Sequence, residues 1–238
     1  LTKEGETLIP SIREFLRANA KLENQIAAIT DKKRDTIRVA AYASIAMHWM
    51  PEILYRFRRV CPNIDVDLRM VDNAIEPFEL LEKGRTDVIF AAKQAGFSCD
   101  WTPLCQDAMY AILPPDYPLD GQETFPIEAF EGKEFLMPYG KFDLDVKAVL
   151  AANNVKPKFR PCHVDDETVI RMVGKGLGLS MMAEMMIRGR TNGVTAVPIE
   201  PATGRELGMG LHMRESMPDG ILRLRECVGV RILVVENA

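Results

Sequence analysis

Polar side chains follow several predicted strands of this chain, at positions where they could bind a small molecule. Ser44 comes after the first strand and starts a predicted helix, so its hydroxyl and the nearby unpaired backbone N–H groups could bind an anion. A plain helix N-cap is the alternative for Ser44. Asn73 and Ala74 follow the second strand, where the Asn73 side chain could cap a helix or offer its amide to a ligand. Lys93 follows the third strand and is either a ligand contact or a solvated surface lysine.

A second group of candidates lies between a later strand and a helix, at residues 139–142. Tyr139 and Phe142 could flank a ring, and Lys141 could pair with a carboxylate. Gly140 has no side chain and would let a ligand approach the backbone. These residue types together predict an effector that is an organic acid or an aromatic compound.

No catalytic or metal-binding set is recognisable beside these candidates. Asp165 follows another strand and is a further candidate contact, whereas we interpret its neighbour Asp166 as a helix N-cap. The histidines His48, His163 and His212 lack the spacing of metal ligands, and no Ser/His/Asp or Cys/His arrangement is present. The sequence therefore predicts binding without catalysis, with no metal and no cofactor.

Composition excludes several classes of protein. The 238 residues are 47% hydrophobic and 27% charged, with a net charge of -4 and no large Lys/Arg cluster, so the chain has no strong nucleic-acid footprint. No apolar run reaches the roughly 18 residues that a membrane span needs. The five cysteines never form a CxxC pair, which is typical of reduced thiols in a cytoplasmic protein.

The elements that must position the candidates form two α/β lobes. Strands are predicted at 37–42, 66–71, 87–92, 107–114, 134–139, 159–164, 177–182, 194–199 and 206–214. Helices are predicted at 44–60, 77–84, 142–153, 166–176, 183–189 and 221–235. Alternating strands and helices with short connections indicate Rossmann-like parallel sheets. Because such sheets bind ligands at the carboxyl ends of their strands, we expect one cleft between the lobes.

The lobes are expected at 36–107 plus 211–238 and at 108–210, with two strands crossing between them. A long helix over 1–32 precedes them, and its apolar residues recur at alternating spacings of four and three. That stripe consists of Leu8, Ile12, Phe15, Asn19, Leu22, Ile26 and Ile29. A narrow heptad stripe predicts dimerisation through this helix, although the helix could instead pack on its own domain. The helix-start signal in LTKEGETLIP suggests a chain cut from a longer one.

Several segments resemble the LysR-type transcriptional regulators. VCPNIDVDLRMVDN followed by LLEKGRTDVIFAA is similar to a family pattern, as are PLCQDAMYAILPPDYPL and VIRMVGKGLGLSMM. LTKEGETLIP resembles the junction between the family's DNA-binding domain and its linker helix. The Asp-Tyr-Pro and Met-Met sequences depart from the usual His-Pro and Leu-Pro. The order and spacing of these segments cover nearly the whole chain.

The resemblance implies a regulatory domain with a periplasmic-binding-protein type II-like fold and a linker helix, lacking the N-terminal winged helix-turn-helix. It implies an effector bound between the lobes, a homodimer or homotetramer, and DNA binding through the missing domain. RNA polymerase is a further implied partner of the full-length protein, and no membrane is involved. A solute-binding protein of the same two-lobe plan is the main alternative, which the heptad helix and unpaired cysteines disfavour. An enzyme of this architecture is disfavoured by the missing catalytic set.

Overall fold

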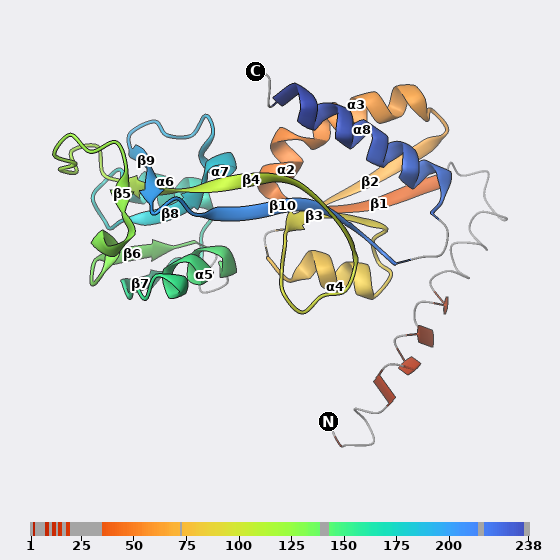
Figure 1. Ribbon diagram of the computed structural model, residues 1–238, viewed down its shortest axis with the longest axis horizontal. Coiled ribbons are helices and arrows are strands. Elements are labelled where there is room, and N and C mark those ends of the chain that lie inside the picture. Colours follow the sequence, from red (N-terminus) through yellow and green to blue (C-terminus); the bar gives the residue numbers. More distant parts are fainter. Residues whose placement is uncertain are drawn as a thin grey trace. The chain divides into compact units, whose positions relative to one another are not determined.

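The computed structural model describes residues 35–71, 73–138, 143–213 and 217–235, together with a few positions before residue 35 (Figure 1). The chain divides into two compact units. Unit 1 consists of Leu1–Val71, Ile75–Thr102 and Met209–Ala238, and unit 2 consists of Asp72–Ala74 and Pro103–Gly208.

Unit 1 contains a parallel sheet flanked by helices. Its strands are β1 (Asp35–Tyr42), β2 (Ile64–Val71) and β3 (Val88–Ala92), and its helices are α2 (Ala43–His48), α3 (Met50–Val60), α4 (Glu76–Glu82) and α8 (Asp219–Val235). β1 lies in the middle and pairs in parallel with both β2 and β3. The predicted alternation of strand and helix is therefore present.

The predicted single helix over 44–60 is wrong, because two helices occupy this segment. α2 ends at His48 and α3 begins at Met50, with Trp49 between them. Pro51 lies at the start of α3. A proline has no N–H and is tolerated in the first turn of a helix, but it interrupts a helix that would continue through it.

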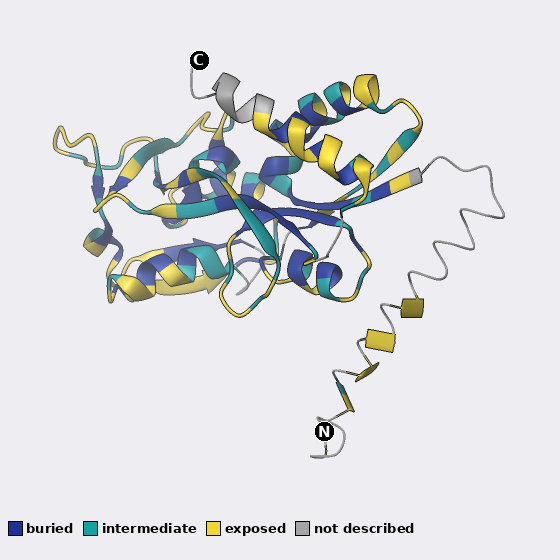
Figure 2. Ribbon diagram, turned by 45° about the vertical axis from the view of Figure 1, so that its right-hand side comes forward, coloured by how far each residue is buried: buried dark blue, intermediate teal, exposed yellow. Residues whose placement is uncertain are grey.

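The core of unit 1 lies between its sheet and its helices. All five residues of β3 are buried, and α3 packs against α8 (Figures 1 and 2). At the amino end of the sheet, the Arg38 guanidinium forms two hydrogen bonds with the Asp87 carboxylate, at 3.0 and 2.9 Å. The Arg38 backbone N–H donates to the same carboxylate at 2.9 Å. This pair fixes β1 to the start of β3, far along the strands from their carboxyl ends.

Unit 2 is built around β4 (Asp100–Leu113), which starts earlier than the predicted residue 107. The remaining elements are β5 (Phe125–Pro126), η1 (Ile127–Phe130), β6 (Glu134–Met137), α5 (Leu144–Ala152), β7 (Lys158–Pro161), α6 (Asp166–Val173), β8 (Ser180–Ala183), α7 (Glu184–Ile187), β9 (Thr195–Glu200) and β10 (Gly204–Leu211). β4 pairs antiparallel with β8 and β9, while β6 and β7 form a parallel pair. β4 and β10 are hydrogen-bonded neighbours, and the boundary between the units falls within both strands.

Phenylalanine rings form the centre of unit 2. Phe130 lies 4.8 Å from Phe125 and 5.3 Å from Phe135, measured between ring centroids, and these three side chains are buried. Phe135 also meets Phe159 of β7 edge to face at 5.6 Å. Aromatic pairs in such tilted geometries contribute about 0.5–1.5 kcal/mol beyond their burial. The rings thereby connect η1, β6 and β7.

Candidate functional site

The carboxyl ends of the unit 1 strands lie along one edge of the sheet. In the register of β1 with β2, Tyr42 stands opposite Val71, and β3 runs parallel to β1 on its other side. The loops that leave these three strands therefore start along the same edge, and the predicted contacts Ser44, Asn73 and Lys93 follow directly. Open α/β sheets bind ligands along this kind of edge.

Ser44 is buried at this edge. α2 begins at Ala43 and its N-cap is Tyr42, so Ser44 is the second residue of the helix and the N-cap alternative is wrong. The residue is 2% exposed and has an interaction within the protein. A buried hydroxyl in the first helical turn lies among the backbone N–H groups that have no partner inside the helix. Its chemistry suits an anionic or carbonyl group.

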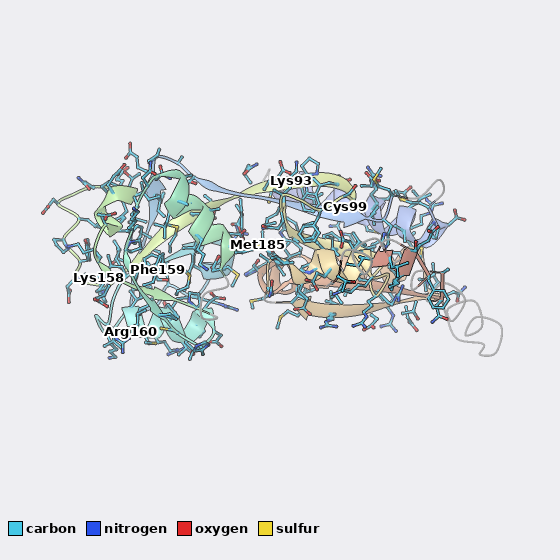
Figure 3. The ribbon with its side chains drawn as sticks, turned by 90° about the horizontal axis from the view of Figure 1, so that it is seen from below. Lys93, Cys99, Lys158, Phe159, Arg160 and Met185 are labelled. Carbon is cyan, nitrogen blue, oxygen red and sulfur yellow. The ribbon has the colours of Figure 1, made fainter. Side chains whose placement is uncertain are left out.

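The other unit 1 candidates differ in exposure. Ala74 is buried and Asn73 is half-buried, and the division of the chain assigns both to unit 2. Lys93 is exposed directly after β3. Its ammonium acts on the thiol of Cys99, whose pKa is raised mainly by burial and by Asp100 and is lowered in part by Lys93. The Lys93 ammonium and the Cys99 thiol therefore lie near each other in unit 1 (Figure 3).

The four candidates at 139–142 lie outside the described residues. The elements on either side match the predicted order, since β6 ends at Met137 and α5 begins at Leu144. Asp143 caps α5, and its carboxylate accepts a hydrogen bond from the Val146 N–H at 3.1 Å. A strand therefore leads into this segment and a capped helix leads out of it.

A buried ionic network that the sequence analysis missed lies beside the start of α5. The Arg205 guanidinium contacts an Asp107 carboxylate oxygen at 2.9 and 3.0 Å and an Asp145 carboxylate oxygen at 3.0 Å. The other Asp107 oxygen accepts a hydrogen bond from the Met185 N–H at 3.0 Å. The network therefore joins β4, α5, α7 and β10 (we refer to Arg205, Asp107 and Asp145 as the Arg205 network).

The Arg205 network is nearly removed from solvent. The side chains of Arg205, Asp107 and Asp145 are 13%, 3% and 12% exposed. Burial alone would lower the pKa of Arg205, but the two carboxylates outweigh burial and raise it, so the guanidinium stays charged. The pKa of the neighbouring Asp143 is raised, chiefly by burial, with a smaller opposing effect of the Val146 hydrogen bond. Two carboxylates thus share one guanidinium at the amino end of α5.

Asp165 caps α6 at the end of the strand and loop that precede it. Its carboxylate accepts a hydrogen bond from the Thr168 N–H at 2.9 Å, and hydrogen bonds to Thr168 lower its pKa. The cap expected at Asp166 is therefore wrong by one residue, since Asp166 is the first residue of the helix and is buried. Asp165 is exposed, so the capping role leaves its charge at the surface.

Within the described part of the chain, no group of three or more His, Cys, Asp or Glu side chains could hold a metal ion. All five cysteines are free thiols. None of the helices in the described residues is both long enough and apolar enough to span a membrane.

The predicted dimerisation stripe is partly visible. Leu8, Ile12 and Phe15 are 56%, 53% and 69% exposed, and Asn19 is exposed as well. Leu22, Ile26 and Ile29 lie outside the described residues. Large apolar side chains exposed on one helical stripe are typical of a surface that packs against another helix.

Comparisons with known proteins agree with this geometry. The family model described as the LysR substrate binding domain matches residues 30–230. The HTH-type transcriptional regulator TtuA of Agrobacterium vitis is 24% identical over 214 residues, covering 87% of this chain and 70% of TtuA. The uncharacterized HTH-type transcriptional regulator YvbU of Bacillus subtilis is 23% identical over 194 residues, covering 79% of this chain and 64% of YvbU. The chain thus spans about two thirds of the length of these relatives.

Solved structures show the same fold. The BenM effector binding domain with its effector benzoate superposes with a TM-score of 0.72 at 20% identity, covering 85% of this chain and 94% of that domain. The CcmR regulatory domain of Synechocystis PCC6803 in complex with 2-PG gives a TM-score of 0.71 at 19% identity, covering 82% and 97%. The predicted α/β architecture of the periplasmic-binding-protein type II-like class is confirmed.

Proposed function

The chain belongs to the LysR family, and from this premise we propose that it binds a small organic effector at the carboxyl ends of its strands, with Ser44 among the contacts. The match to the family's substrate binding domain covers most of the chain and confirms the resemblance seen in the sequence. The chain is an effector-binding regulatory domain, and the family regulates transcription and is not enzymatic.

The single observation that supports the site is the parallel register of β1, β2 and β3. It places the starts of three loops along one sheet edge, and the buried Ser44 hydroxyl occupies the first helical turn at that edge. The proposed contacts are Ser44, Asn73, Ala74, Lys93, Tyr139, Gly140, Lys141, Phe142 and Asp165. Binding would act by favouring one conformation of the protein through a difference in affinity.

We expect the effector to be an organic acid or an aromatic compound. The lysine ammonium groups of Lys93 and Lys141 can pair with a carboxylate, and the rings of Tyr139 and Phe142 can pack on an apolar body. Benzoate, the effector bound to the BenM domain of the same fold, is an aromatic carboxylate.

A solute-binding protein with the same architecture is the alternative function. The curated relatives that match this chain are HTH-type transcriptional regulators, which favours the regulator. We therefore propose that the chain works in the cytoplasm as part of a longer protein that binds DNA through a winged helix-turn-helix. RNA polymerase would be a partner of that longer protein.

Replacing Ser44 with Ala should weaken effector binding about tenfold or more, because a lost hydrogen bond to a charged group costs about 1.5–3 kcal/mol. Ser44 does not cap α2, but it is buried and has an interaction within the protein, so the variant should stay folded with a melting temperature that is only a few degrees lower. A thermal-shift screen of small acids and aromatic compounds identifies the effector, and calorimetry with that compound compares wild type and variant.

The matched control is Ser98→Ala, which removes an exposed hydroxyl elsewhere in unit 1. It should leave the dissociation constant unchanged. If Ser44→Ala and Ser98→Ala bind the effector equally well, Ser44 has no place in the site.

We further propose self-association through the N-terminal helix as a homodimer or homotetramer. Light scattering should give a mass of at least twice 26.7 kDa, and Phe15→Glu should shift the population toward the monomer because it places a charge in the exposed stripe. Leu177→Glu makes the same kind of change at an exposed apolar residue of unit 2, and it should leave the oligomeric state unchanged. A wild-type chain that is monomeric at micromolar concentration contradicts this proposal.

A further inference from the structure

The loop that follows β3 carries the proposed effector contact Lys93 and then turns back into β4. β3 ends at Ala92 and β4 begins at Asp100, so residues 93–99 form the loop, which we call the 93–99 loop. Gly96 lies at the turn with a φ of +88°, in the left-handed region that glycine adopts without strain. The loop therefore starts at the carboxyl edge of the parallel sheet and reverses direction at Gly96.

Phe97 attaches this loop to α4. Its ring stacks on the ring of Phe78, with the centroids 4.8 Å apart and the planes at 26°. Phe78 is 2% exposed and lies in the first turn of α4, while Phe97 is half-buried. Phe78 also stacks on Trp101, near the start of β4, at 6.1 Å. Stacked aromatic pairs contribute beyond their burial, so this contact holds the second half of the loop on the helix.

Two further contacts attach the loop at its later residues. Ser98 donates a hydrogen bond from its hydroxyl to the Met213 sulfur at 3.5 Å, but both residues are exposed and a thioether is a weak acceptor. The Cys99 sulfur packs near β10, where a Cβ added at Gly210 would lie 3.3 Å from it. Of these attachments, the aromatic stack lies nearest to the start of the loop.

Two opposite charges lie near the Cys99 thiol. Burial has the largest effect on the pKa of this thiol and raises it, the Asp100 carboxylate raises it further, and the Lys93 ammonium lowers it. Lys93 and Cys99 lie near each other (Figure 3). A carboxylate of the chain can therefore compete with a ligand for the ammonium, and the conformation of the loop affects which of them it meets.

From the stacked rings and the placement of the loop at the sheet edge, we propose that Phe97 is a positioning residue for effector binding, which acts through Lys93. The ring holds the 93–99 loop on α4, and the loop holds the ammonium where it meets the carboxylate of an effector. Such preorganisation raises affinity because less conformational freedom is lost on binding. The inference rests on the proposed function and adds that a ring outside the proposed contacts sets the preference for an anionic ligand.

Calorimetry with benzoate and with neutral benzamide as probes separates recognition of charge from packing. Wild type should bind benzoate about tenfold more tightly than benzamide, because the amide cannot form a charge-assisted pair. Phe97→Ala should reduce this selectivity about threefold or more and leave benzamide affinity within about twofold. Phe97→Tyr keeps the ring and should restore the selectivity. A merely structural role of the ring would weaken binding of both probes alike.

A double-mutant cycle shows whether Phe97 acts through Lys93. Lys93→Met removes the ammonium and keeps most of the apolar stem, so it should remove at least as much selectivity as Phe97→Ala. In the Lys93→Met background, Phe97→Ala should change benzoate affinity by less than about twofold. Equal losses with and without the ammonium contradict the inference, because the ring would then act elsewhere.

Labelling of Cys99 with iodoacetamide, measured by peptide mass spectrometry, follows the loop without a ligand. Phe97→Ala should increase the labelling rate about fivefold, because the loop around this half-buried thiol opens more often. Ser98→Ala removes an exposed hydroxyl from the same loop, and Tyr117→Ala removes a half-buried ring that meets Phe125 edge to face in unit 2. Neither control should change the labelling rate or the selectivity.

The outcomes separate this inference from the proposed function. Unchanged selectivity in Phe97→Ala overturns the inference, whether or not the labelling rate rises. If Ser44→Ala weakens benzoate binding while Phe97→Ala does not, the proposed site stands and the inference alone fails. If wild type binds neither probe at millimolar concentration, the proposed class of effector fails, and the inference fails with it.

Discussion

Replacing Arg205 with Met should lower the free energy of unfolding of unit 2 by about 3–5 kcal/mol, the usual cost of removing one partner from a buried ion pair. Asp107 is 3% exposed and would keep its negative charge with no cation beside it. Asp145 would lose the same partner. Urea denaturation followed by far-UV circular dichroism measures the loss.

Unit 1 provides an internal reference for this experiment. Both tryptophans, Trp49 and Trp101, belong to unit 1, so tryptophan emission follows that unit while circular dichroism follows both. The urea midpoint of Arg205→Met should therefore fall further when unfolding is followed by circular dichroism than when it is followed by tryptophan emission.

Arg188→Met is the matched control, because the ion pair of Arg188 with Glu184 is about half exposed on both sides. Exposed pairs contribute about 0–1 kcal/mol, so this variant should change little. Adding Asp107→Asn and Asp145→Asn to Arg205→Met should recover part of the loss. A cost below about 1 kcal/mol for Arg205→Met would mean that the network does not stabilise unit 2.

The same variant should impair the proposed effector site. Asp145 lies in the first turn of α5, directly after the segment 139–142 that carries four of the proposed contacts. Arg205 holds this turn against β4 through Asp107. Without the guanidinium, the amino end of α5 loses its ionic attachment, so effector affinity should fall together with stability.

The second large effect is expected for Phe135→Ala, at about 3–5 kcal/mol of unfolding free energy. Phe135 is fully buried and contacts the rings of Phe130 and Phe159 at once. Its loss leaves a cavity between η1 and β7, which the rigid strands around it cannot close. Chemical denaturation of the variant measures the cost.

Phe159→Ala is the control because it removes a ring from the same cluster. Phe159 is 45% exposed, so its replacement removes less buried apolar surface and leaves a smaller cavity. It should therefore lower the free energy of unfolding by about half as much or less. Equal costs for the two variants would show that burial does not determine the contribution of these rings.

Local patterns in the sequence were sufficient to predict most elements, and the residues that were misread show where local information ends. The strand 66–71 and the helix 77–84 were found because apolar periodicity and the Pro and Gly at the helix ends are local signals. The break at Trp49 was missed, although Pro51 was a visible signal for it. The cap at Asp165 was displaced by one residue, because two adjacent aspartates both suit the position.

The Arg205 network could not be predicted from local sequence patterns. Asp107 and Arg205 lie 98 positions apart in the chain, and a charged residue at the start of a strand gives no sign of its partner. Ser44 is a candidate because it lies two residues after the end of a strand, which is a local feature. Contacts that depend on how distant segments pack therefore require the structure.

The division of the chain has a consequence for the order in which the protein folds during synthesis. Unit 2 is nearly continuous in sequence, at Pro103–Gly208, whereas unit 1 needs Met209–Ala238 to complete its sheet and to pack α8 on α3. Chains emerge from the ribosome amino end first, and domains generally fold as units. Unit 2 can therefore reach its native structure before unit 1, although unit 1 includes residues that precede it in the sequence. Because Met209–Ala238 are synthesised after unit 2, a variant truncated before α8 should retain a folded unit 2 and an incomplete unit 1.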